Sequence, residues 1–322
     1  MTAGEIQKKI RELQELARRE NIDIHADLDR LQSKLEGDPA SQLADAWHRV
    51  ELARHADRPT TLTYVEHMSE QFLELHGDRA FSDDPALVGG ICTIDGIPFT
   101  FLGHQKGKNM KENLRRNYGM AHPEGYRKAL RLAKQAERFG RPLLTLIDTP
   151  GAFPGVSAEE RGIGEAIARN LREFSVLRTP IIVVIIGEGG SGGALGIGVG
   201  DRVFMLENTI YSVISPEGFA SILLRDSKKA QQAAELMRMT STDLKGFGVV
   251  DGVIPEPPGG AHREPERMAE RLRKEILESY RVLSKKKTEQ LLRERSEKAL
   301  SLGLFYDPSE RRRGLFGRRR SR

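Results

Sequence analysis

The chain has 322 residues, of which 38% are hydrophobic and 30% are charged, and its formal net charge is +5 at pH 7. No apolar run approaches the roughly 18 residues of a membrane-spanning helix, and the N-terminus shows no apolar signal-peptide segment, so we expect a cytoplasmic protein that does not bind a membrane. Cys92 is the only cysteine, which excludes an intrachain disulfide and a zinc site made of several thiolates.

The positive charge is concentrated at the C-terminal end. Residues 307–322 carry seven arginines against Asp307 and Glu310, which gives +5 for this segment and leaves the rest of the chain neutral. We expect a disordered tail, the only part of the chain through which nucleic acid or another polyanion would bind. The rest of the sequence has no aromatic stacking motif for nucleic acid and no zinc finger.

The first part of the chain has helical periodicity. Residues 5–36 repeat apolar positions at spacings of three and four, which predicts two helices in a hairpin or a bent arm. Residues 41–55 predict a short helix, and residues 63–75, which begin with a capping-box pattern, predict another. We expect residues 1–60 to form an N-terminal helical arm that packs on its own domain or at a subunit interface.

A change of period then predicts two strands, over 87–94 and 97–102, joined by an Asp-Gly hairpin turn. The polar run HQKGK follows directly at a strand end, where α/β folds place ligands. His104 and Lys106, its first and third residues, are therefore candidate site residues.

Two successive units next repeat the order helix, strand and glycine-containing turn. The helix, strand and turn of the first unit are predicted over 123–139, 143–147 and 148–155, and those of the second over 157–177, 181–186 and 187–200. Such units predict parallel strands with right-handed crossovers. Both glycine loops then lie at the same edge of the sheet, close together.

The segment 187–200 contains eight glycines in fourteen residues. Glycine allows positive φ and the close approach of a ligand to backbone N–H groups, and a helix that begins here would direct its positive dipole end at the loop. A P-loop is excluded because Gly193 and Ala194 stand where Lys and Ser or Thr are needed. Three hypotheses remain open: a nucleophile elbow at Ser191, an oxyanion hole made of backbone N–H groups alone, and a tight strand-to-helix crossing that binds no ligand.

The last third predicts short strands and helices before a long charged helix. The strands are expected over 203–206, 210–214 and 248–254, and the helices over 217–224, 228–239 and 263–300. Apolar positions in the long helix are too sparse for a core, so we expect an arm that lies on a surface or a partner. The predicted organisation is a central domain over 61–262, a C-terminal helix over 263–306 and the tail over 307–322.

Nine motifs occur in order along the chain. They are VGGI at 88–91, GHQKG at 103–107, RRNYGM at 115–120, PEGYRKALRL at 123–132, DTPGAFPG at 148–155, AEERG at 158–162, EAIARNLRE at 165–173, GEGGSGGALGIGVGD at 187–201 and YSVISPEG at 211–218. Together they resemble the α subunit of the carboxyltransferase component of bacterial acetyl-CoA carboxylase. The resemblance implies an α/β, crotonase-like (ClpP/crotonase) fold, a spiral of ββα units, with helical N-terminal and C-terminal arms.

The resemblance also implies an activity and partners. The carboxyl group would move from carboxybiotin, carried on the biotin carboxyl carrier protein, to acetyl-CoA, giving malonyl-CoA in the first committed step of fatty acid synthesis. The chain would act in an α2β2 heterotetramer whose β subunit supplies a zinc ribbon and the acetyl-CoA half of the site, with biotin carboxylase in the full complex. We expect no metal in this chain.

The implied reaction needs backbone donors more than a nucleophile, because negative charge develops on the ureido oxygen of biotin and on the enolate of acetyl-CoA. The biotin anion can itself take the proton, so no side-chain base is required. We assign Gly192, Gly193, Gly151 and Ala152 as catalytic, and Gly189, Gly190, His104, Lys106, Asn117 and Tyr118 as residues that bind substrate or carboxybiotin.

Two other functions compete with this hypothesis. A serine hydrolase that uses Ser191 would need a histidine after the serine, and only His262, in a Pro/Gly linker, follows it. A non-enzymatic scaffold or RNA-binding protein would act through the helical arms and the Arg-rich tail. That hypothesis leaves both glycine loops unexplained.

Overall fold

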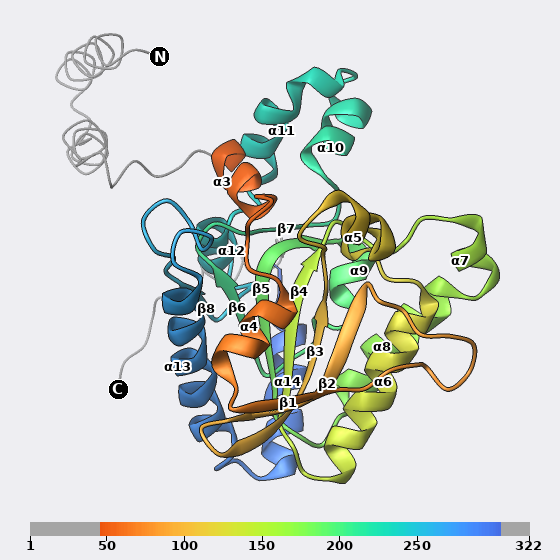
Figure 1. Cartoon of the computed structure of the whole chain (residues 1–322). Coiled ribbons are helices and arrows are strands. Elements are labelled where there is room, and N and C mark those ends of the chain that lie inside the picture. Colours follow the sequence, from red (N-terminus) through yellow and green to blue (C-terminus); the bar gives the residue numbers. More distant parts are fainter. Residues whose placement is uncertain (1–45, 304–322) are drawn as a thin grey trace, which may run out of the picture. The chain divides into compact units, whose positions relative to one another are not determined.

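A computed structural model describes residues 46–303 (Figure 1). The predicted helices over 5–36 and the Arg-rich tail lie outside the described residues. None of the helices between residues 46 and 303 combines the length and the hydropathy that a membrane crossing requires.

One sheet, with the strand order β1-β2-β3-β4-β5-β6-β8 and with β7 paired to β5, lies at the centre of the described chain. Its strands are β1 Gln71–Glu74, β2 Leu87–Ile94, β3 Ile97–His104, β4 Leu143–Thr149, β5 Ile181–Gly190, β6 Arg202–Leu206, β7 Ile210–Ser212 and β8 Gly252–Ile254. The pairs β1–β2 and β2–β3 are antiparallel, and the pairs from β3 onward are parallel. The predicted hairpin and the predicted parallel neighbours β4 and β5 are therefore confirmed.

Helices cover both faces of this sheet (Figure 1). The α-helices are α3 Ala46–Ala53, α4 Thr61–Met68, α5 Met110–Arg115, α6 Pro123–Arg138, α7 Val156–Glu160, α8 Ile163–Ser175, α9 Ser191–Leu195, α10 Pro216–Leu223, α11 Ala230–Met237, α12 Ser241–Gly246, α13 Pro265–Leu283 and α14 Thr288–Leu300. Within residues 46–303 the 3-10 helices are η2 Asn117–Gly119 and η3 Ser227–Lys229.

The side chains of β5 alternate between two hydrophobic cores, as the pleat of a strand requires. The odd-numbered residues from Ile181 to Ile185 face a core that also contains buried residues of α6 and α8. The even-numbered residues from Ile182 to Ile186 face a second core, with buried residues of α4 and α13. The prediction of a strand buried on both faces is confirmed.

Two predicted helices differ from the structure. The helix over 63–75 is wrong in its second half: α4 begins after Thr60 and ends at Met68, and β1 then pairs with β2, with Phe72 opposite Cys92. The helix over 157–177 is divided into α7 and α8 by Gly162, whose φ is +79°. The capping box predicted for the helix over 63–75 does not form, because Thr60 is the N-cap residue of α4. The N-cap residue of α7 is Gly155.

The long C-terminal helix is also corrected, because it is two helices, α13 and α14. Met268, Leu272 and Ile276 of α13 are fully buried in the second core, so this helix is part of the body and not an arm. A helix that covers one face of a sheet needs only one apolar stripe. The sparse apolar positions of α13 are enough to form such a stripe.

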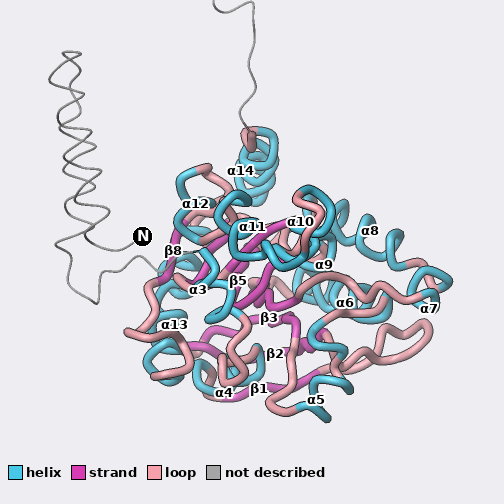
Figure 2. Tube along the Cα trace, turned by 90° about the horizontal axis from the view of Figure 1, so that it is seen from above, coloured by secondary structure: helices cyan, strands magenta, loops and turns pink. Residues whose placement is uncertain are grey.

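The helices α10 and α11 lie beyond the carboxyl ends of the central strands (Figures 1 and 2). Ser215 is the N-cap residue of α10 and accepts a hydrogen bond from the Gly218 N–H at 3.1 Å, with Pro216 in the first turn. The helix α12 was not predicted.

Candidate active site

The two glycine loops meet at the carboxyl ends of β4 and β5. Gly190 and Gly193 lie against the first loop so closely that a Cβ on Gly193 would be 2.4 Å from the carbonyl carbon of Gly151. A Cβ on Gly190 would be 2.1 Å from the carbonyl oxygen of Pro150. Backbone packing therefore requires glycine at both positions, and the predicted meeting of the loops is confirmed.

Gly192 and Gly151, in contrast, have space around them. A Cβ on Gly192 would come no closer than 3.7 Å to Ile167, and a Cβ on Gly151 would have no atom within 4 Å. Because α9 begins at Ser191, the N–H groups of its first residues have no acceptor within the helix. The N–H groups of Gly192 and Gly193 are therefore free of intrahelical hydrogen bonds.

Ser191 adopts a left-handed backbone conformation in this loop, with φ +50°. We expected positive φ at the glycines, but none of the residues from Gly189 to Gly193 other than Ser191 has it. A sharp strand-to-helix turn of this kind also occurs in nucleophile elbows. His262 does not complete such a site: its ring stacks on His55, with the ring centroids 3.8 Å apart, and its Nδ1 has no hydrogen-bond partner.

An ion-pair network crosses the same strand ends. Lys106 Nζ lies 2.7 Å from Asp148 Oδ1 and 2.9 Å from Glu188 Oε2. Arg54 Nε lies 2.7 Å from Glu188 Oε1, and its Nη1 lies 2.7 Å from Glu217 Oε1 in α10. The network therefore connects α10 to the ends of β4 and β5.

The ion pairs in this network stabilise the ionised forms of Lys106 and Glu188. Burial by itself would lower the pKa of Lys106, but the Asp148 and Glu188 carboxylates raise it to about 12. Burial would raise the pKa of Glu188, but Lys106 and Arg54 lower it to about 2. At neutral pH Lys106 is protonated and cannot accept a proton, and Glu188, with a pKa of about 2, is too weak a base for general-base catalysis.

Sequence reasoning identified Lys106 but missed its two carboxylates. Asp148 and Glu188 are the acidic residues near the ends of two strands that were predicted to be parallel neighbours. The ends of parallel strands converge at one edge of a sheet. A sequence with an acidic residue near two such ends and a lysine at the end of a third strand therefore predicts an ion pair there.

His104 ends β3 and is fully buried. Burial, and then the charge of Lys106, lower the pKa of His104 to about 3, while the Gly193 backbone acts weakly in the opposite direction. The ring lies near the Gly193 backbone, but neither ring nitrogen reaches a partner with the geometry of a hydrogen bond. His104 therefore lies in the interior and is neutral at pH 7, and its contact with substrate or carboxybiotin stays a prediction.

Asn117 and Tyr118 form a left-handed turn beside the network, with φ +46° and +54°. The next residue, Gly119, packs so tightly that a Cβ there would lie 2.6 Å from the carbonyl oxygen of Asp148 and 3.3 Å from Lys106 Cγ. Tyr118 is 38% exposed. The structure thus brings this turn to the strand ends, and its contact with a ligand stays a prediction.

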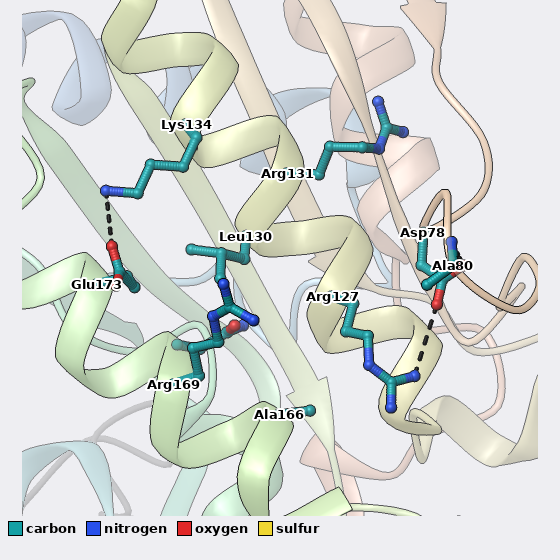
Figure 3. A pocket seen from close by; sticks show the side chains of 10 residues that line it. Asp78, Ala80, Arg127, Leu130, Arg131, Lys134, Ala166, Arg169 and Glu173 are labelled. Atoms are coloured by element: carbon teal, nitrogen blue, oxygen red, sulfur yellow. Dashed lines mark hydrogen bonds and ion pairs between the residues drawn. The ribbon is translucent and has the colours of Figure 1, made fainter. Parts of the chain in front are cut away.

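A separate pocket of about 340 Å³ lies between α6 and α8 (Figure 3). It is lined by Asp78, Ala80, Arg127, Leu130, Arg131, Lys134, Ala166, Arg169, Asn170 and Glu173, none of which belongs to the glycine loops. Lys134 pairs with Glu173 at 2.8 Å and Arg127 with Asp78 at 3.5 Å. Within residues 46–303 no group of three or more His, Cys, Asp or Glu side chains is placed to hold a metal ion.

The sequence matches known proteins over nearly its whole length. The model of the family described as acetyl co-enzyme A carboxylase carboxyltransferase-like matches residues 2–303. The acetyl-coenzyme A carboxylase carboxyl transferase subunit alpha of Treponema denticola is 56% identical over 91% of this chain and 95% of its own length. The protein of the same name from Geobacillus sp. strain WCH70 is 53% identical over 94% of this chain and 93% of its own length.

Solved structures with less similar sequences share the fold. Transcarboxylase 12S is 20% identical, with a TM-score of 0.58 over 70% of this chain and 41% of that chain, so this chain spans about two fifths of it. The Pseudomonas malonate decarboxylase MdcD–MdcE heterodimer has a chain that is 19% identical, with a TM-score of 0.56 over 81% of this chain and 98% of that chain. These likenesses confirm the expected crotonase-like α/β fold.

Proposed function

Because the chain belongs to the acetyl-CoA carboxylase carboxyltransferase α-subunit family, we propose that it takes the carboxyl group from carboxybiotin on a biotin carboxyl carrier protein and passes it to acetyl-CoA, forming malonyl-CoA in the cytoplasm. The family supports carboxyl transfer and not the serine hydrolase or the RNA-binding scaffold. The observation that carries the proposal is the direct packing of the two glycine loops, which leaves backbone donors beside open space.

We propose that the Gly192 and Gly193 N–H groups hold the oxygen on which negative charge develops, with Gly189 and Gly190 shaping the loop. A Cβ on Gly151 would meet no atom within 4 Å, and one on Gly192 would make only ordinary van der Waals contact with Ile167, which suits the approach of a planar ureido ring. The Gly151–Ala152 turn would form the facing wall. One preorganised donor of this kind is worth about 10²- to 10³-fold in kcat.

The side chains beside the loops favour a mechanism without a protein base. Lys106 is held protonated by two carboxylates, and His104 is buried with its pKa lowered to about 3, which makes its imidazole a weak base. When bound, carboxybiotin supplies the carboxyl group and, once that group has left, an acceptor for the methyl proton of acetyl-CoA. The role of Lys106 is then to hold Asp148 and Glu188, and with them the ends of β4 and β5.

We propose that a β subunit completes the site, in an α2β2 assembly, by docking over α10 and α11. Large apolar side chains on and next to these helices are exposed, with Val213 at 79%, Ile222 at 67% and Leu223 at 64%. Leu195 of α9, next to the glycine loop, is 43% exposed. An exposed apolar surface beside a reaction site is typical of a subunit interface.

The test is to assay the purified chain alone and after mixing with its β partner, using carboxybiotin and acetyl-CoA as substrates. We expect malonyl-CoA to form only in the mixture. We also propose that the domain over 61–262 holds every assigned site residue, so a chain truncated after residue 306 should assemble and turn over normally. Robust malonyl-CoA formation by the chain alone would contradict the two-subunit site.

A further inference from the structure

The glycine loop continues into α9, a helix too short to be stable without contacts from the rest of the protein. α9 has only five residues, Ser191–Leu195, and two of them are glycine. Helices of this length are unstable in isolation, and glycine weakens them further. The direction of the Gly192 and Gly193 N–H groups therefore depends on whatever fixes α9 in place.

Two buried side chains fix its C-terminal half. The last carbonyl groups of a helix have no N–H donor within the helix. The Tyr126 hydroxyl of α6 donates to the carbonyl oxygen of Gly193 at 3.2 Å. The Asn170 side-chain amide of α8 donates to the carbonyl oxygen of Gly196 at 3.0 Å, directly after α9.

The two side chains are also joined to each other. Asn170 Nδ2 donates a second hydrogen bond to the backbone carbonyl of Tyr126 at 3.0 Å. The Tyr126 ring lies so close to Gly196 that a Cβ there would be 2.6 Å from it. Tyr126 is 0% and Asn170 1% exposed, so both act from within the protein. Burial raises the pKa of Tyr126, which keeps its hydroxyl a donor.

We propose that Tyr126 and Asn170 are positioning residues for carboxyl transfer. Their hydrogen bonds from α6 and α8 fix α9 and thereby orient the N–H groups of Gly192 and Gly193. The proposal rests on the proposed function, because it needs those donors to act in the reaction. Neither side chain touches the reacting groups. A shift of α9 by a fraction of an ångström would misalign both donors at once.

The experiment measures kcat and the KM for acetyl-CoA in the reconstituted complex for Asn170→Ala and Tyr126→Phe. We expect kcat to fall by up to about 100-fold for Asn170→Ala, the loss that a displacement of roughly 1 Å can cause, and less for Tyr126→Phe, which keeps the ring against Gly196. The KM for acetyl-CoA should stay within about twofold, because α9 does not bind that substrate in the proposed mechanism. Hydrogen exchange of the segment 187–200 should become faster in both variants.

The matched control is Thr179→Ala. Thr179 is 2% exposed, its hydroxyl donates to the carbonyl oxygen of Arg141 at 2.8 Å, and it precedes β5 at the opposite end from the glycine loop. This variant loses a buried hydrogen bond of the same kind and should keep the wild-type kcat at temperatures where all proteins are folded.

The outcomes separate the two proposals. A wild-type complex without carboxyl transfer would overturn the proposed function and this inference with it. An active wild type beside variants that keep its kcat, or a Thr179→Ala variant that loses as much kcat as they do, would overturn the positioning role alone. If Asn170→Ala does not assemble, Tyr126→Phe decides.

Discussion

Lys106 Nζ lies 2.9 Å from Glu188 Oε2, across 82 residues of sequence, and this contact joins the segment after β3 to the end of β5. Both side chains are mostly buried, at 18% and 9% exposure. A charge in such a place needs a partner, because water no longer solvates it. The pair therefore stabilises the strand ends on which the glycine loops stand.

The depressed pKa of Glu188 predicts a loss of stability in acid. Its pKa is about 2 in the folded chain and 4.5 ordinarily, so its contribution is complete above about pH 4.5 and is lost as the pH falls toward 2. The contribution is on the order of 3 kcal/mol. Denaturant unfolding at several pH values should show a shallower decline between pH 4.5 and 2 for Glu188→Gln than for the wild type; parallel declines would contradict the assignment.

Neighbouring glycines should respond differently to the same substitution. Gly193→Ala would press its Cβ against the backbone of Gly151 and Ala152, at 2.4 and 2.5 Å, and overpacking of this kind costs about 1–3 kcal/mol. Gly192→Ala meets no atom closer than 3.7 Å and should unfold at the wild-type temperature. Thermal unfolding of the two variants checks this. Equal melting temperatures would show that the loops do not pack as described.

Substitutions at Ser191 separate backbone from side-chain catalysis. Ser191→Ala should change kcat little, because the hydroxyl is not the reacting group, whereas loss of a serine nucleophile costs on the order of a million-fold. The φ of Ser191 is +50°, a conformation that is as strained for alanine as for serine. Ser191→Gly is thus the second variant: it relieves a backbone cost of about 1–2 kcal/mol, offset in part by the greater entropy of glycine. Malonyl-CoA formation by the complex is the readout for both, and an inactive Ser191→Ala that folds normally would refute the backbone mechanism.

Arg295 should be essential for docking α14 on the body. Its guanidinium donates to both Asp201 oxygens at 2.8 Å and to the carbonyl oxygens of Phe174, Leu177 and Thr179 at 2.8 to 3.0 Å. Arg295→Met leaves the Asp201 carboxylate buried without this cation and should cost about 3–5 kcal/mol of unfolding free energy.

The control for that prediction lies two residues earlier on the same helix. Arg293 is 68% exposed and lies 3.8 Å from Glu297, so Arg293→Met should change stability by no more than about 0.5 kcal/mol. Similar unfolding free energies for the two variants would mean that α14 does not depend on the Arg295 contacts.

Much of the fold was predictable from local patterns. The β2–β3 hairpin follows from an Asp-Gly turn between two apolar runs, and α6 and β5 follow from clear helical and strand periods. The parallel order of β4 and β5 follows from two repeated units, and it places the glycine loops together. These features depend on residues that are close in the sequence.

By itself, the sequence determined the family, the central strands and the meeting of the two glycine loops, because turn chemistry, periodicity and motif order are local properties. Only the tertiary structure decided that residues 71–74 pair with β2 as a strand, that Lys106 binds Asp148 and Glu188, and that Asn170 grips the end of α9. The physical reason is that each of these contacts joins residues far apart in the sequence. Their hydrogen bonds and burial outweigh local preference, and they exist only once the sheet has brought the partners together.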